Sequence, residues 1–352
     1  MVRGYLKETM NKVKEGKPMI TEAQIRTELA KVFVPVVEQS VADLNLVRKI
    51  DITADNITIT LASTALTPDV QNFVAAGVRS ALQPLKTPVA VEFVEAKPQE
   101  LNNIKNIIAV MSGKGGVGKS LVTALMAIAL RRQGKNVGIL DADITGGSIP
   151  RMFGISTRPY GSETGLLPVV SESGIEIMSM NLLLPQEETA VIWRAPMLSK
   201  AIQQFWTDVV WGKLDYLLID LPPGTADAPL TVMQSIPIAG VIIVSTPQGL
   251  VEMIVKKAID MAQKMEKPIL GIVENMSYFQ APDTQKKYQL FGAGKGESLA
   301  KAANAPLLGQ LPIDPELTRL CDNGDIEHYT DVSVASLGKA LQTALETRNK
   351  SG

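Results

Sequence analysis

The sequence predicts an α/β protein with a doubly wound, mostly parallel sheet and a small N-terminal α/β domain. From residue 106 onward, short apolar runs alternate with helical segments, which is typical of a parallel sheet covered on both faces. Upstream, apolar residues alternate with threonine over 57–61, which indicates a half-buried strand. The chain has 352 residues, 45% hydrophobic and 20% charged, so it can bury a sizeable core.

The small domain is predicted from two helices and two strands. Helical spacing of apolar residues runs over 21–33, and a second helix over 68–82 begins at Pro68 after Thr67, an expected N-cap. The strands are 57–61 and 89–93. The chain then divides into 1–18 as a flexible N-terminus, 19–95 as the small α/β domain, 96–105 as a linker rich in turn residues, and 106–352 as the larger domain, with Met1 or Met19 as the true start.

The larger domain contains a series of predicted strands whose carboxyl ends carry glycine and aspartate. In an open parallel sheet, ligands bind beyond these ends, so we expect the site there. The predicted strands are 107–112, 137–141, 175–180, 216–220, 240–245, 268–273 and 306–311.

Composition restricts the class of protein. The net charge of −1 gives no argument for nucleic-acid binding, and no apolar stretch reaches about 18 residues, so we expect neither nucleic acid nor a membrane as partner. The first residues lack the apolar core of a signal peptide, which favours a cytoplasmic location. Cys321 and His328 are the only residues of their types, too few for a structural zinc site within one chain.

The most informative segment is 113–120, which reads Gly-Lys-Gly-Gly-Val-Gly-Lys-Ser. It fits the phosphate-loop pattern and lies between a predicted strand and a predicted helix, where backbone N–H groups and the helix dipole converge on an anion. We expect Lys119 to reach the β and γ phosphates of ATP and Ser120 to bind Mg²⁺. The predicted nucleotide-binding residues of the loop are Gly113, Lys114, Gly115, Gly116, Val117, Gly118, Lys119 and Ser120.

Three aspartates follow other strands and complete the predicted magnesium and water site. Asp141 ends one strand and is expected to hold a water on Mg²⁺, while Asp143 is expected to orient the attacking water; the alternative is a turn-capping pair. Asp220 ends an apolar strand of the Walker B type and is expected near Mg²⁺. The turns after these strands are candidate switches, with Gly146, Ser148, Gly224, Thr225 and Asp227 as their residues.

A second lysine, Lys114, directly follows the first glycine of the loop and resembles the signature lysine of the deviant Walker ATPases. In that group two subunits face each other, and this lysine reaches the nucleotide of the partner. The resemblance therefore implies a homodimer in which Lys114 acts much as an arginine finger does.

Taken together, the motifs resemble the Mrp/ApbC family of iron–sulfur cluster carrier ATPases. Besides the phosphate loop, the resemblance rests on the Asp141-x-Asp143 element, on Asp-Leu-Pro-Pro-Gly-Thr from Asp220, on Ser-Thr-Pro-Gln over 245–248 and on Glu-Asn-Met-Ser-Tyr-Phe over 274–279. It covers 106–345, and the upstream unit resembles the iron–sulfur-assembly domain often fused ahead of this ATPase. It implies adenine contacts by Asn275 and Pro312, a P-loop fold like that of MinD and ParA, and iron–sulfur assembly or client apoproteins as partners.

Two departures from the family pattern bear on function. Relatives that carry clusters place a Cys-x-x-Cys pair where this chain has Ala281 and Thr284. Cluster irons usually take four thiolates, and a homodimer here offers two, so direct cluster binding is not expected from these residues. Gly147 stands where the family commonly has proline, which predicts a looser switch segment.

The sequence therefore predicts a slow, dimeric MgATP hydrolase that acts in iron–sulfur cluster assembly or transfer. An alternative is a nucleotide-gated switch or adaptor of the MinD and ParA kind without a cluster. A third class, a ligase or kinase for a small metabolite, lacks a recognisable substrate motif.

Overall fold

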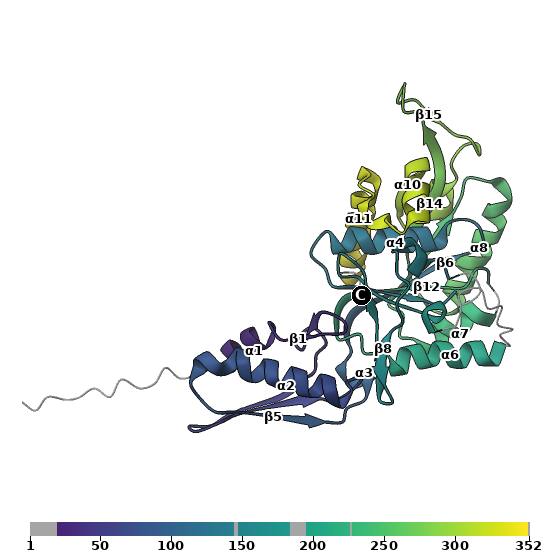
Figure 1. Ribbon diagram of the computed structural model, residues 1–352. Helices are drawn as coiled ribbons and strands as arrows, with labels where there is room; N and C mark the ends of the chain where they lie inside the picture. The colour runs from purple at the N-terminus through teal and green to yellow at the C-terminus, as the bar shows by residue number, and fades with distance from the viewer. Residues whose placement is uncertain (1–19, 144–146, 184–194, 226, 351–352) are drawn as a thin grey trace, which may run out of the picture.

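One mixed sheet forms the centre of the larger unit. The computed structural model describes residues 20–143, 147–183, 195–225 and 227–350. In this part of the chain, nine strands pair in the order β10-β11-β7-β12-β6-β13-β14-β15, with β16 beside β14 (Figure 1). Only β10 and β15 are antiparallel to their neighbours. The bounds are β6 Asn103–Ser112, β7 Val137–Asp141, β10 Val169–Val170, β11 Glu176–Ser179, β12 Lys213–Asp220, β13 Gly240–Ser245, β14 Ile269–Gln280, β15 Lys287–Tyr288 and β16 Leu307–Ile313.

The inner strands are buried along their whole length, because helices cover both faces of the sheet. The predicted strands over 137–141 and 240–245 are confirmed residue for residue. The strand predicted to end at 273 instead continues to Gln280. Its second half is polar and contains Met276 at φ +54°, where the pairing with β16 shifts register, so the apolar run alone does not show the extension.

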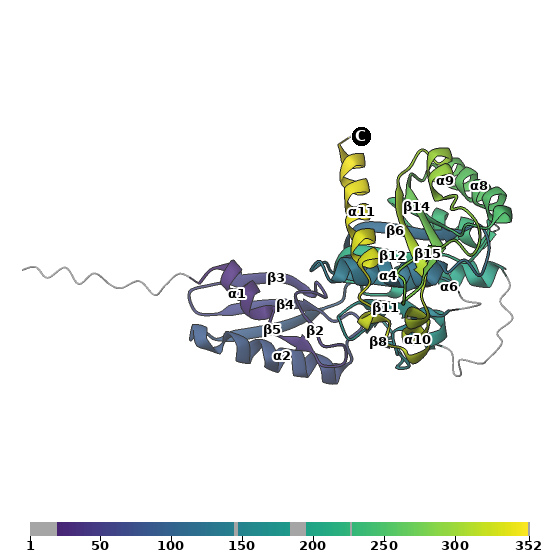
Figure 2. The same ribbon diagram turned by 90° about the horizontal axis from the view of Figure 1, so that it is seen from above.

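Helices form a layer on each face of the sheet, and Figures 1 and 2 show the two layers from perpendicular directions. One hydrophobic cluster contains residues of α4, α5, α10 and α11, and the other contains residues of α6, α7, α8 and α9. None of the described helices is long and apolar enough to cross a bilayer. The bounds are α4 Lys119–Arg131, α5 Ile149–Met152, α6 Ala195–Asp208, α7 Asp227–Ser235, α8 Gly249–Lys264, α9 Gly296–Ala302, α10 Pro315–Asn323 and α11 Val332–Asn349.

The small unit is a three-stranded sheet with two helices. Helix α2 (Pro68–Leu82) has the predicted bounds, whereas α1 (Glu22–Leu29) ends four residues before the predicted 33. Thr67 is the N-cap residue of α2, as predicted, but its hydroxyl hydrogen-bonds the Tyr160 hydroxyl at 2.7 Å and makes no hydrogen bond to the helix backbone. The remaining elements are β1 Phe33–Val34, β2 Gln39–Ser40, β3 Val47–Ile52, β4 Ile57–Ala62 and β5 Val89–Val94.

The segment 96–105, predicted as a linker, is folded. It contains helix α3 (Pro98–Leu101) and the first residues of β6. Asn102 lies between them, and its Oδ1 accepts hydrogen bonds from the backbone N–H groups of Trp211 at 2.7 Å and Gly212 at 3.2 Å. The Asn102 side chain thus bonds this segment to the backbone of the larger unit. A segment rich in turn-forming residues does not reveal such a contact in its sequence.

The two units share one hydrophobic cluster. Leu101, Leu167 and Val210 are buried in the same cluster as the apolar residues of α1, α2 and β4. Leu167 lies on β9 (Gly165–Leu167), which pairs with β8 (Tyr160–Ser162). Leu167 and Val210, which lies shortly before β12, are both residues of the larger unit. The two units therefore pack against each other through this shared hydrophobic cluster.

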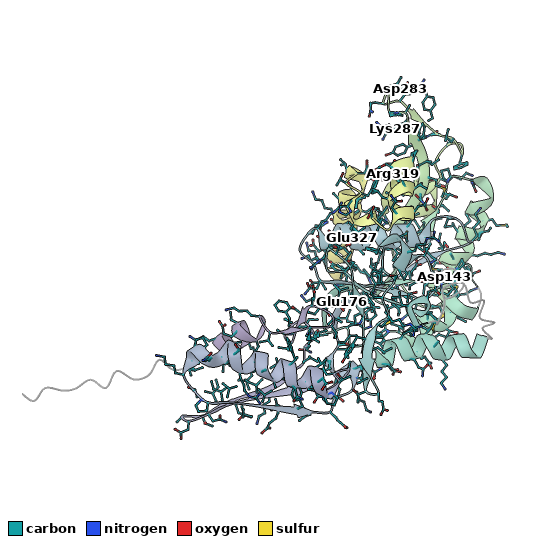
Figure 3. All side chains as sticks on the ribbon, in the orientation of Figure 1. Asp143, Glu176, Asp283, Lys287, Arg319 and Glu327 are labelled. Atoms are coloured by element: carbon teal, nitrogen blue, oxygen red, sulfur yellow. The ribbon has the colours of Figure 1, made fainter. Side chains whose placement is uncertain are left out.

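A buried polar pair also crosses this contact. Gln39 on β2 donates through Nε2 to Glu176 Oε1 on β11 at 2.5 Å, and Figure 3 labels Glu176 where the units meet. Among the described residues, neither Glu176 Oε2 nor Gln39 Oε1 has a hydrogen-bond partner. A proton on Glu176 Oε2 would turn this buried acceptor into a donor and remove the buried charge. Burial, followed by the nearby Asp43 charge, raises the pKa of Glu176 to about 8, against opposing effects of Gln39 and Arg131.

The free energy of unfolding is expected to fall between pH 5 and pH 8 because of Glu176. In this window the folded chain keeps a proton on Glu176 that the unfolded chain releases, since the pKa is about 8 when folded and ordinarily 4.5. The loss is at most about 1.4 kcal/mol per pH unit. Glu176→Gln replaces the carboxyl group by an amide of nearly the same shape that does not titrate. Its free energy of unfolding should therefore rise relative to that of the wild type as pH rises. Urea unfolding of both proteins at pH 5, 6, 7 and 8 measures this, and a constant difference across pH would contradict it.

Candidate functional site

The phosphate loop connects β6 to α4 at the carboxyl edge of the sheet. Gly118 precedes α4 and has φ +80°, a backbone conformation that residues other than glycine rarely adopt. Asn275, on β14, donates through Nδ2 to the Val117 carbonyl at 2.9 Å. A Cβ on Gly118 would lie 2.2 Å from this nitrogen, so glycine is required both by the backbone angle and by the approach of Asn275.

Asp220 is the centre of the polar contacts beneath the loop. Its carboxylate is fully buried, accepts a hydrogen bond from Ser120 Oγ at 2.5 Å and pairs with Lys119 Nζ at 2.7 Å. Thr123 also donates to it, at 2.9 Å. The sequence predicted Lys119, Ser120 and Asp220 together but did not single out Thr123, whose position one turn after Lys119 on α4 was the available signal.

The two other predicted aspartates lie at the same edge. Asp141 Oδ1 accepts from the Asp143 backbone N–H at 3.1 Å, and Asp141 Oδ2 accepts from Ser179 Oγ at 3.0 Å. Asp143 Oδ2 lies 3.8 Å from Lys119 Nζ (Asp143 is labelled in Figure 3). Burial, and then the neighbouring charge of Asp220, raises the pKa of Asp141, while Lys119 opposes the shift.

This arrangement fits a hard divalent cation. The Ser120 hydroxyl and the carboxylates of Asp141 and Asp220 supply oxygen atoms, the ligands that Mg²⁺ prefers. Lys119 is the ammonium group that the structure pairs with Asp143 and Asp220. A bound cation would therefore oppose burial and the Asp220 charge, the two effects that raise the pKa of Asp141.

The predicted switch residues are placed only in part. Gly224 has φ +93° and donates its N–H to the Ser112 carbonyl at 3.1 Å, and Thr225 follows it half-buried. Ser148 is the residue before α5, but its hydroxyl does not cap that helix. Gly146 and the side chain of Asp227 lie outside the described residues, as does the N-terminus with Met1 and Met19.

Gly147, from which a looser switch segment is predicted, is closely approached by two polar side chains. Its carbonyl accepts from Asn181 Nδ2 at 3.0 Å. A Cβ at this position would lie 2.6 Å from the same nitrogen and 2.9 Å from Asp141 Oδ2. Glycine is present here because two polar side chains approach the backbone closely.

Lys114, the second lysine, is half-buried at the edge of the loop. Its Nζ donates to Gln248 Oε1 at 3.2 Å, and Gln248 is the residue before α8. Within one chain it therefore lies beside the start of α8, while Lys119 carries the contacts to Asp143 and Asp220.

A largely apolar cavity of about 350 Å³ adjoins the phosphate loop. Asn275 and Pro312, the predicted adenine contacts, both line it, together with Leu121 from the first turn of α4. Cys321 lines it too, and burial raises the pKa of this thiol to about 11. A neutral thiol is a weak nucleophile and a poor metal ligand, so Cys321 serves here as a small half-buried side chain.

The positions of the family cysteines lie on a hairpin arm, which we define as residues 278–288. The end of β14 pairs with β15 here, and Figure 3 shows Asp283 at the tip of the arm, far from Asp143. Ala281 and Thr284 belong to the turn, which is closed by hydrogen bonds from Ala281 N to the Lys286 carbonyl and from Gln285 N to the Ala281 carbonyl. The turn folds without any side-chain ligand from these two residues.

Comparison with known proteins identifies the family. A protein-family model described as NUBPL iron-transfer P-loop NTPase matches residues 103–346, and a second, described as iron–sulfur cluster assembly protein, matches residues 22–93. The chain belongs to the NUBPL iron-transfer P-loop NTPase family. The phosphate loop, Asp141, Asp143 and Asp220 all lie within the first matched segment.

Relatives of this NTPase carry consistent names. The chain is 41% identical over 324 residues to an iron–sulfur cluster carrier protein of Synechocystis, covering 87% of this chain and 91% of the relative. It is 51% identical over 233 residues to one of Methanocaldococcus jannaschii, covering 65% and 80%. Among solved structures, a nucleotide-binding protein of Archaeoglobus fulgidus in complex with ADP is 48% identical with a TM-score of 0.59, covering 65% of this chain and 90% of that one.

Proposed function

We propose that this NTPase binds MgATP and hydrolyses it slowly as a face-to-face homodimer that serves iron–sulfur cluster assembly or transfer. The observation that carries the proposal is the contact of Lys119 and Ser120 with the buried Asp220 beneath the phosphate loop. The ADP complex of the Archaeoglobus relative and the names of the curated relatives support the nucleotide and the cargo.

Each residue of the site has a distinct task in this reaction. The loop N–H groups and Lys119 would bind the phosphates, while Ser120, Asp141 and Asp220 would hold Mg²⁺, the two aspartates through water. The cation neutralises charge on the phosphates. Asp143 lies beside Lys119 at 3.8 Å and orients the water that attacks the γ-phosphorus, and Lys114 of the partner subunit stabilises the charge that develops there. Asn275 and Pro312 border the adenine.

Release of phosphate from ATP, with and without Mg²⁺, is the direct test of the enzymatic part. We expect Mg²⁺-dependent turnover at the low end of the usual range for enzymes, roughly 1 per second or below. Hydrolysis indistinguishable from a protein-free blank at saturating ATP would overturn it.

One observation favours a second candidate, a nucleotide-gated adaptor of the MinD and ParA kind that holds no cluster itself. Ala281 and Thr284 supply no thiolate on the arm, where relatives that carry clusters have their cysteine pair. In this variant of the proposal the cluster, as cargo, is bound by a partner protein, and the ATP state controls which partner binds.

Anaerobic reconstitution with iron and sulfide separates the two. The wild type is expected to retain less than about one iron per dimer after desalting, because cluster irons usually need four thiolates. Ala281→Cys/Thr284→Cys, which gives a dimer four thiolates on its arms, should retain a cluster with visible absorption. A stoichiometric cluster on the wild type would instead favour direct carriage, and Cys321→Ala would then show whether that thiol is a ligand.

A further inference from the structure

The loop that follows the arm contributes an aromatic ring to the cavity beside the phosphate loop. Phe291 lies between β15 and α9, lines the cavity and is 42% exposed, which is unusual for so large an apolar side chain. The cavity begins at Leu121, the residue after Ser120. Most of its other lining residues are apolar, such as Pro312 and Leu317, and the polar ones are Asn275, Asp314, Thr318 and Cys321. A planar base entering here from the phosphate side would meet the Phe291 ring.

A buried carboxylate holds this loop in place. Glu274 on β14 is fully buried, and its Oε1 accepts hydrogen bonds from the backbone N–H groups of Lys295 at 2.6 Å and Gly296 at 2.8 Å. Its Oε2 accepts from Ser277 Oγ at 2.7 Å and from Gln310 Nε2 at 2.8 Å. Both oxygens are therefore satisfied within the protein, and the ordinary role of a nearby carboxylate, metal or proton transfer, is not required to explain Glu274.

The glycines of this loop are explained by the same contact. A Cβ on Gly294 would lie 2.6 Å from Glu274 Oε2, and one on Gly296 would lie 2.8 Å from Leu307 Cδ1 and 3.2 Å from Glu274 Cβ. The Gly-Ala-Gly-Lys-Gly run over 292–296 can therefore close around Glu274. Since Phe291 directly precedes this run, the position of its ring depends on the anchored backbone four residues later.

We propose that Phe291 packs on the base of the bound nucleotide and that Glu274 is the positioning residue that holds the Phe291 loop over the base cavity. The proposal rests on the proposed nucleotide function and adds to it the residues that contact the base, on the side of the site away from the phosphates. Stacking against an aromatic ring does not depend on the hydrogen-bonding edge of the base, so Phe291 adds affinity for any purine nucleotide. It contributes nothing to a ligand that has phosphates only.

The placement also connects the nucleotide with the arm. Tyr288 of β15 pairs with Phe279 of β14, and the chain runs from Tyr288 through Phe291 to the Glu274 contacts within eight residues. A base that fixes Phe291 therefore restrains the root of the arm, whereas a phosphate-only ligand leaves it unchanged.

Calorimetric titration with Mg²⁺–ADP and with Mg²⁺–tripolyphosphate tests the proposal. Phe291→Ala should weaken ADP binding by about tenfold, because base–aromatic stacking is worth roughly 1–3 kcal/mol and 1.4 kcal/mol is a factor of ten. Tripolyphosphate binding should not change. Leu290→Ala is the matched control, since Leu290 is the adjacent exposed apolar residue, at 58%, and does not line the cavity.

Glu274→Gln tests the positioning role, because it keeps the shape but places an amide group against Gln310 or against the loop N–H groups. We expect weaker ADP binding with unchanged tripolyphosphate binding, in the same sense as Phe291→Ala but smaller. Unchanged ADP affinity in Phe291→Ala, or an equal loss for both ligands, would overturn the inference while leaving the proposed function intact. A wild type that binds neither ligand would refute the proposed function itself, and this inference with it.

Discussion

Lys119→Met is expected to lower kcat for ATP hydrolysis by roughly 10²–10³-fold, the range found when a group that stabilises transition-state charge is removed. Lys119 is 5% exposed and lies 2.7 Å from Asp220 and 3.8 Å from Asp143, so its ammonium group is fixed at the end of the phosphate loop. Phosphate release under saturating Mg²⁺–ATP measures the effect. A variant that retains a tenth of the wild-type rate would contradict the role assigned to Lys119.

The same substitution is also expected to destabilise the protein, which calls for a control. Removing the cation leaves Asp220 buried without its charge partner, and breaking a buried pair on one side costs about 3–5 kcal/mol. Lys119→Arg keeps a positive charge beside Asp220 but has a longer, planar donor group that does not take the same position. We expect Lys119→Arg to unfold at nearly the wild-type urea concentration and still to hydrolyse ATP at least roughly 10²-fold more slowly.

Lys114→Ala is expected to reduce hydrolysis by roughly 10³-fold or more, as loss of an arginine finger does. Its stability should hardly change, because Lys114 is half-buried and its ammonium group donates a hydrogen bond to the neutral Gln248 side chain at 3.2 Å. Gln248→Ala, which removes that partner only, is the matched control and should keep most of the activity.

Mixing the two lysine variants distinguishes action within one subunit from action across the dimer. In a mixed dimer, the Lys114→Ala subunit keeps its own Lys119 and receives Lys114 from the Lys119→Arg subunit, so one of two sites is complete. Equal mixing should therefore restore about a quarter of the wild-type rate, if subunits exchange freely between two-fold dimers. If Lys114 acts on the nucleotide of its own subunit, every site in the mixture lacks one lysine and no activity returns.

The sequence predicts the chemistry of the phosphate side well because that chemistry is local. The loop, its flanking strand and helix are consecutive, and parallel strands bring Asp141 and Asp220 to one edge wherever the helices pack. Their pairing in register confirms that step.

Contacts between distant segments could not be predicted in the same way. Gln39 and Glu176 are 137 residues apart, and neither has a neighbouring pattern that marks it as a partner. Asn102 lies in a segment whose turn-forming residues favour a loop, yet its side chain bonds the backbone of residues 209–212. The role of Glu274 was likewise hidden, because a charged residue in the polar half of β14 does not show by itself which backbone it anchors.

The hydrophobic cluster that joins the two units sets a condition on exchanging parts between relatives. Leu167 and Val210 belong to the larger unit in sequence but are buried with the small one. A chimera that replaces only the N-terminal segment would therefore set a foreign apolar surface against these two side chains, and a shortened chain without it would present them to water. A foreign N-terminal domain should therefore pack well only if the larger unit carries matching apolar residues at positions 167 and 210. The structural boundary of the small unit thus includes residues from the later part of the chain.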